Sequence, residues 1–298
     1  MTKALFQRTS FPWVKYSEYE WRERDGILYV VTAPNANPTI YNPLKDTDQL
    51  VLDALNVGML QMDRADDATV KAALMDFVSK YGLLGFMTAL PTTPHFTDYD
   101  AVYLPTNHFI RAESMPVVEY VEQFFPFEKP DFTHHKGDST WHLRDDDNEM
   151  AALAMTFATG PMALSLSFQR EYAERVDWLL EQFKDLAFTF IASHFYYRDY
   201  DKIDEDNRNL YRRAVAAFGG ITPTYRIGLF EKPTIIWDFY SLSLGIQMMF
   251  SFMLTDEKAP LHFCLNCHCI FMAKRTDAKF CCPECKNQYN VGKSRGKK

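Results

Sequence analysis

All six cysteines of this 298-residue chain lie in its last 35 residues. Cys264-Leu-Asn-Cys267 is followed, after 13 residues, by Cys281-Cys282-Pro-Glu-Cys285. A disulfide scaffold spreads its cysteines through the chain, whereas a metal site gathers them. Two close pairs are typical of a Zn²⁺ site, in which four thiolates form a tetrahedron around the ion. The spacing therefore predicts one zinc ion with no open position, which makes it structural and not catalytic.

The second cysteine pair can be chosen in two ways. The preferred ligand set is Cys264, Cys267, Cys281 and Cys285. The rival set replaces Cys281 with Cys282. Pro283 suits the first turn of a helix, so Cys281 would precede that helix and Cys285 would lie one turn into it. Amides at the start of the helix would then stabilise both thiolates. His268 and Cys269 are too close to Cys267 for an unstrained tetrahedron, and we expect them to be neighbours of the metal.

Charge is divided unevenly between this segment and the rest of the chain. Residues 264–298 have a net charge of +6, whereas residues 1–263 have −13, which gives −7 overall. An acidic body with a basic tail predicts that an anionic partner meets the tail first.

The composition is that of a globular protein, with 47% hydrophobic and 24% charged residues. Disorder over most of the length is therefore excluded. The amino-terminal residues lack the long apolar stretch of a signal peptide, and no run of about 20 apolar residues predicts a membrane span. We expect a cytoplasmic protein with reduced thiols and no membrane partner.

Apolar residues at helical spacing predict a mainly helical body over residues 1–258. The expected helices run from Asp46 or Thr47 through Met62, Ala68–Tyr81 capped by Asp67 and stopped by Gly82, Val117–Phe125, Met162–Tyr197 as one helix or two joined near Gln182, Ile203–Phe218, and Pro233 or Thr234 to Leu254.

The predicted β structure is small. Two aromatic and β-branched runs flank Asp25-Gly26, a favoured turn pair, and predict a hairpin over Trp13–Val31. Tyr225–Phe230 could form a short strand. Residues 126–149 form a polar connection where the body could divide, near 126–150. The expected fold is therefore α+β, mainly α, followed by a zinc-finger module over 259–298.

The cysteine segment resembles the C-terminal finger of bacterial CGNR-type zinc-finger proteins, which include the ABATE-domain proteins. The likeness covers about the last 40 residues: Cys-x2-Cys-x3-Phe, a short basic loop, and Phe-Cys-x3-Cys-Lys-Asn-Gln. It implies a treble-clef-like finger that uses Cys264, Cys267, Cys281 and Cys285, and a role in transcription regulation. Where the family name expects Cys-Gly-Asn-Arg, this chain has Cys285-Lys286-Asn287-Gln288.

Three function classes follow from these features. The first is binding of DNA or RNA, with phosphate contacts from Lys274, Arg275, Lys286, Lys293 and Arg295. The second is a protein-interaction finger attached to a helical body that senses a ligand or signal. The third is an enzyme, which we do not expect because the chain has no Walker-type loop, no Gly-x-Ser-x-Gly elbow and no His-Glu-x-x-His. His134, His135 and His142 are interpreted as exposed loop residues.

Overall fold

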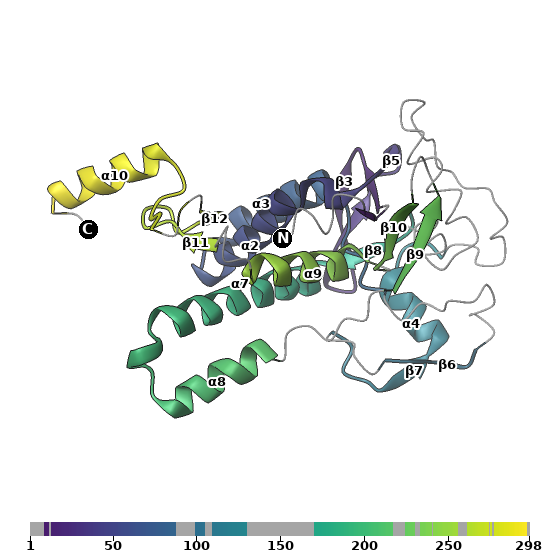
Figure 1. Cartoon of the computed structure of the whole chain (residues 1–298). Helices are drawn as coiled ribbons and strands as arrows, with labels where there is room; N and C mark the ends of the chain where they lie inside the picture. Colours follow the sequence, from purple (N-terminus) through teal and green to yellow (C-terminus); the bar gives the residue numbers. More distant parts are fainter. Residues whose placement is uncertain are drawn as a thin grey trace.

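The computed structural model of the chain describes residues 9–11, 13–87, 99–104, 109–129, 170–216, 224–229, 233–239, 241–255, 261–273, 275 and 277–296. In this part of the chain, helices pack with several small sheets, which confirms the predicted α+β class (Figure 1). The helices are η1 (Pro43–Asp46), α2 (Thr47–Met62), α3 (Asp67–Tyr81), α4 (Val117–Phe124), α7 (Val176–Arg198), η3 (Tyr200–Lys202), α8 (Glu205–Ala216), α9 (Leu242–Leu254) and α10 (Pro283–Ser294). The strands are β1 (Thr9–Ser10), β2 (Trp13–Tyr16), β3 (Tyr19–Arg24), β4 (Ile27–Thr32), β5 (Pro38–Tyr41), β6 (Ala101–Tyr103), β7 (Ser114–Pro116), β8 (Ala173–Arg175), β9 (Thr224–Leu229), β10 (Pro233–Asp238), β11 (Leu261–Phe263) and β12 (Ile270–Met272).

Helix ends agree closely with the sequence where a local signal sets them. α2 begins at Thr47, and α4 lies where it was predicted. α3 begins one residue early, because Asp66 and not Asp67 is its cap and accepts the N–H of Thr69 at 3.0 Å. Gly82 ends α3 with a φ of 87°.

α8 begins at Glu205, two residues later than predicted. The side chain of Asp204 accepts the N–H of Asn207 at 2.8 Å and so caps the helix there. The predicted end of this helix at Phe218 lies outside the described residues.

Among the described residues of the long helix predicted over Met162–Tyr197, α7 begins at Val176 and continues through Gln182 without a break. Residues 162–169 lie outside the described part of the chain. Ala173–Arg175 forms β8 instead of helix, because this segment pairs with Tyr29–Val31 of β4. β8 is thus a third strand beside β3 and β4.

The turn at Asp25-Gly26 joins β3 and β4, and both turn residues have positive φ. The predicted hairpin is confirmed for Tyr19–Thr32 only, since β2 pairs with β5.

The prediction of an apolar helix from Pro233 or Thr234 to Leu254 is wrong for the first half of this segment. β10 occupies Pro233–Asp238 and pairs with β9, whose predicted strand is confirmed, and with β1. α9 begins only at Leu242, where the Ser241 side chain accepts the N–H of Leu244 at 3.1 Å. Short apolar runs do not by themselves distinguish strand from helix, and here the strand partner decides.

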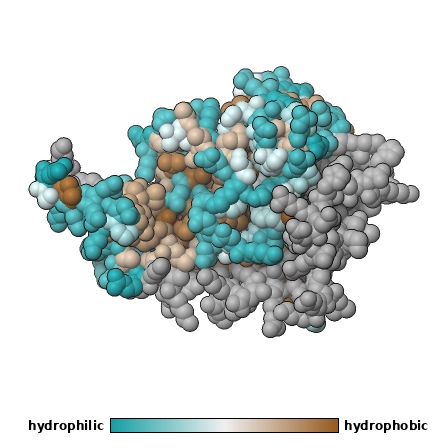
Figure 2. Space-filling model, turned by 90° about the horizontal axis from the view of Figure 1, so that it is seen from above, coloured by the Kyte–Doolittle hydropathy of each residue, from teal (hydrophilic) through white to brown (hydrophobic). Residues whose placement is uncertain are grey.

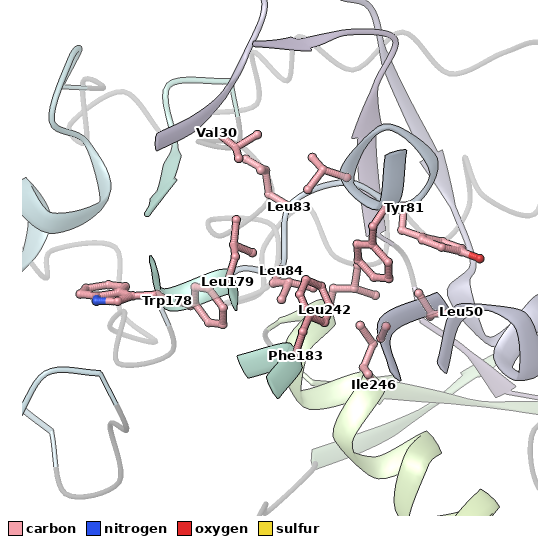
Figure 3. Packing of buried hydrophobic residues seen from close by; sticks show 14 of the residues in the cluster. Val30, Leu50, Tyr81, Leu83, Leu84, Trp178, Leu179, Phe183, Leu242 and Ile246 are labelled. Carbon is pink, nitrogen blue, oxygen red and sulfur yellow. The ribbon is translucent and has the colours of Figure 1, made fainter. Parts of the chain in front are cut away.

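The core surrounds residues 82–87, a buried segment without regular structure. Figure 3 shows Leu84 between Leu179 of α7 and Leu242 of α9. The carboxylate of Glu174 accepts the N–H groups of Leu84 and Gly85, and the Trp13 ring donates to the Leu83 carbonyl at 2.9 Å. These side chains provide the hydrogen bonds that a buried, irregular backbone needs.

α2 and α7 cross at the centre of this core, and Gly58 makes the crossing possible. A Cβ atom on Gly58 would lie 2.0 Å from the carbonyl oxygen of Phe183. The two helices therefore approach more closely than any larger residue at 58 would permit.

Some predictions fall on residues that the structure does not describe. These are Lys274, the three loop histidines, and the connection over residues 126–149 beyond position 129, together with the division near it. Among the described residues, every helix is too short or too polar to span a bilayer.

Candidate metal centre

Four cysteine sulfurs come together at the carboxyl-terminal end of the chain. The Sγ atoms of Cys264, Cys267, Cys281 and Cys285 all lie within 4.8 Å of one another. Cys281 Sγ lies 3.7 Å from Cys267 Sγ and 3.6 Å from Cys285 Sγ. Zn–S bonds of about 2.3 Å place sulfurs about 3.8 Å apart in a tetrahedron, so the cluster has the dimensions of a metal site. These are the four cysteines of the preferred set.

Cys264 and Cys267 lie on the turn that joins β11 to β12. The N–H of Cys264 donates to the carbonyl of Cys269 at 2.9 Å, and that of His268 to the carbonyl of Cys264 at 3.0 Å. His268 has a φ of +60°, which reverses the chain and directs it back into β12. The turn brings both sulfurs of the Cys-x2-Cys pair to one side, as their spacing predicts.

Cys281 and Cys285 lie at the start of α10. Cys282 is its N-cap, Pro283 its first residue, and Cys285 is in its first turn, as predicted from Pro283. The turn contacts both the loop before this helix and the helix itself. The N–H of Leu265 donates to the carbonyl of Lys279 in the loop at 3.0 Å, and Asn266 Nδ2 donates to Gln288 Oε1 in the helix at 2.9 Å.

Electrostatics favour a cation between these sulfurs. Burial disfavours the thiolate of Cys264, but the backbone N–H groups of Cys267, Cys281 and Asn266 outweigh it and lower the pKa of Cys264 to about 6. Burial and the neighbouring thiols raise the pKa of Cys281. Without a cation, negative charge on one sulfur thus opposes ionisation of the next. A bound metal ion removes this conflict, because it binds all four as thiolates.

The β11–β12 hairpin is attached to the body at two places. The Asn56 side chain on α2 accepts the N–H of Ile270 at 2.8 Å and donates to its carbonyl at 3.1 Å. The Phe263 ring packs on Phe190 and His194 of α7, with ring centroids 4.9 and 5.1 Å apart. Sequence reasoning missed Asn56, since its partner is 214 positions away and nothing local distinguishes it.

Phe280 and Phe271 pack on different elements of the finger. Phe280 packs on Tyr289 of α10, with ring centroids 5.3 Å apart, and Phe271 lies 6.2 Å from His262 on the neighbouring strand. Phe280 therefore supports the helix, and Phe271 the hairpin.

α10 projects from one end of the molecule and contains no buried residue (Figure 1). In the space-filling view, the same projection is hydrophilic over most of its visible face (Figure 2). Of the predicted nucleic-acid contacts, Lys286, Lys293 and Arg295 are exposed on or beside α10. Arg275 is also exposed, 3.8 Å from the carboxylate of Asp277.

A cavity of about 350 Å³ lies between α2, α3 and the cysteine turn. Its wall combines carboxylates, an ammonium group and an apolar floor with the backbone of the turn. The lining includes Asp53, Asp76, Phe77, Lys80, His268 and Cys269. The Lys80 ammonium group pairs with Asp53 at 2.7 Å.

Comparisons with protein-family models, curated proteins and solved structures found no match to this chain. The resemblance to CGNR-type fingers therefore stays a prediction from the cysteine segment.

Proposed function

We propose that this chain is a cytoplasmic nucleic-acid-binding protein that acts in transcription regulation, with a finger held together by one structural zinc ion. The observation that supports it most is the pairing of a four-sulfur cluster with an exposed, basic helix. Four soft sulfur ligands suit Zn²⁺ and leave it no open position for catalysis. The function that we propose is therefore binding and not catalysis.

The arrangement of the ligands supports a treble-clef-like finger. Two sulfurs come from a hairpin turn and two from the start of α10, which is the division that the CGNR resemblance implies. Because α10 buries no residue, we infer that the metal fixes its direction relative to the hairpin.

The face of α10 supports contact with phosphates. Lys286 and Lys293 are seven residues apart, two helical turns, and therefore lie on one face together with Asn290. Residues 1–263 have a net charge of −13, so the body repels a polyanion and leaves the finger as the attractive surface.

A salt-titrated binding assay on the full chain, with mixed duplex DNA and mixed RNA, tests the proposal. We expect affinity to fall steeply with salt, and the K286A/K293A/R295A variant to weaken binding and flatten the slope by about 0.9 for each lost phosphate contact. The matched control K184A/K202A/R213A removes equal charge from exposed body positions and should bind like the wild type. Binding that is absent, or indifferent to both salt and the α10 charges, would refute the proposal.

A second candidate is a protein-interaction finger whose body senses a ligand. The cavity supports it, because α2, α3 and the cysteine turn all contribute to the wall. A ligand held there would contact the body and the metal turn together. A partner protein bound by the full chain, with affinity unchanged in K286A/K293A/R295A, would favour this function.

A further inference from the structure

A sulfur that the metal does not require lies against two of its proposed ligands. Cys282 Sγ is 3.8 Å from Cys281 Sγ, and the Cys282 thiol also interacts with that of Cys285. Cys282 is partly exposed, so a small solute can reach its sulfur. Four ligands complete a tetrahedral site, which leaves Cys282 a free thiol in contact with two bound ones.

The position of Cys282 on α10 is suited to disulfide formation. Cys282-Pro283-Glu284-Cys285 is a Cys-x-x-Cys sequence in which the first cysteine is the N-cap and the second lies in the first turn. This sequence pattern is typical of dithiols that alternate with disulfides. Cys281 is a poorer partner, because a disulfide between adjacent residues strains the peptide that joins them.

We propose that Cys282 is a redox-modification site, at which a hydroperoxide converts Cys282 and Cys285 into a disulfide and thereby releases the metal. The inference rests on the proposed metal centre and is independent of nucleic-acid binding. Oxidation would thus remove Cys285 from the ligand set, and metal release would follow.

The chemistry needs only the peroxide. The Cys282 sulfur attacks one peroxide oxygen, the O–O bond breaks, and the departing hydroxide takes the thiol proton and leaves as water. Cys282 is now a sulfenic acid. The Cys285 thiolate then leaves the metal and attacks the Cys282 sulfur, so that the S–S bond forms and the S–OH bond breaks. That hydroxide takes a proton from solvent, and the two sulfurs have lost the two electrons that reduce the peroxide to two waters.

Loss of Cys285 as a ligand has a structural consequence. Three sulfurs remain, and the contacts of α10 with Phe280 and Asn266 are left to hold it. Because none of its residues is buried, the helix separates from the hairpin when the metal leaves. A dithiol reductant reverses the disulfide and permits the metal to bind again.

The test adds hydrogen peroxide to full-length, metal-loaded protein and follows metal release with a chromogenic chelator. The wild type should lose its metal, and Cys282→Ser should retain it under the same conditions. Cys269→Ser removes the other free cysteine and should behave as the wild type. Tryptic residues 280–286 of the oxidised wild type should be lighter by two hydrogen atoms, with one thiol, Cys281, left to alkylate.

Several results would overturn the inference. One is metal release from Cys282→Ser as fast as from the wild type. Another is a wild type that keeps its metal in peroxide. The third is a disulfide that joins Cys267 to another cysteine. Cys282→Ser protein that holds no metal before peroxide would make Cys282 a ligand. The metal content of the wild type before peroxide separates these failures from a failure of the metal centre itself.

Discussion

The body and the finger of this protein are stabilised by different physics. The body buries large aromatic side chains almost completely, among them Trp13, Tyr120 and Phe183, whereas α10 buries none of its residues. Burial of apolar surface stabilises the first region. The second has too little core to fold by burial, and we infer that the metal replaces it. We therefore expect a chelator to leave the body folded and to unfold α10.

Within the finger, the hairpin is held by contacts with the body, whereas we infer that α10 is held by the metal. β11 and β12 are attached to the body by Asn56 and Phe263, whereas α10 contacts the cysteine turn and the loop before it. Metal loss should therefore release α10 and leave the hairpin against α2. The predicted division at residue 259 stays a prediction.

The largest expected effect comes from removing a metal ligand. Cys264→Ser should abolish metal binding and unfold α10 while the body stays folded, since structural zinc contributes about 10–16 kcal/mol to the folding of small fingers. Hydrogen exchange resolved by residue measures both regions at once. Cys269→Ser is the control and should leave the exchange of α10 unchanged. Full metal occupancy in Cys264→Ser would remove Cys264 from the ligand set.

The next largest effect concerns the body alone. Gly58→Ala should lower the free energy of unfolding by about 3 kcal/mol, because the new Cβ meets the Phe183 backbone and not a movable side chain. Gly245→Ala in α9 is the matched control, since its nearest atom is Phe11 Cε1 at 3.1 Å. Urea denaturation measures the difference. Equal stability of the two variants would show that α2 and α7 can move apart without cost.

The body should also respond to pH through Glu174. Burial raises the pKa of Glu174 to about 7. The N–H groups of Leu84 and Gly85 and the Tyr172 hydroxyl lower this pKa, because they favour the charged form, but burial has the larger effect. The folded state then keeps a proton that the unfolded state loses above pH 4.5, so stability falls as pH rises from 4.5 to 7, by up to about 3 kcal/mol. Urea midpoints measured across this range should fall in the wild type and stay flatter in Glu174→Gln. Parallel curves would mean that Glu174 does not titrate there.

The smallest effect tests the attachment of the finger. Asn56→Ala removes both hydrogen bonds to Ile270 and should cost about 1–2 kcal/mol. Exchange of the Ile270 amide should speed up while metal content stays constant. Gln49→Ala on the same helix, which removes only an exposed contact with Asp53, should leave that amide unchanged. An Ile270 amide equally protected in both variants would show that Phe263 suffices to hold the hairpin.

Local signals predicted the parts of the fold that depend on neighbouring residues. Pro283 gave the start of α10, Gly82 the end of α3, and Asp25-Gly26 the turn between β3 and β4. The cysteine spacing left Cys281 and Cys282 as alternatives, and the helix start at Pro283 favoured Cys281, whose sulfur is the one that joins the cluster.

Contacts between distant residues explain what the sequence did not reveal. β8 and β10 are strands because β4 and β9 offer them backbone partners, and neither segment encodes that partner locally. The role of Glu174 depends on Leu84, 90 positions earlier, so its carboxylate looked like any exposed charge in the sequence. The attachment of the hairpin through Asn56 is hidden for the same reason.

X-ray absorption at the zinc edge of the purified, reduced protein identifies the metal and counts its ligands. We expect one zinc per chain, with four sulfur neighbours at about 2.3 Å. A protein without zinc, or zinc with nitrogen or oxygen in place of any of the four sulfurs, would contradict it.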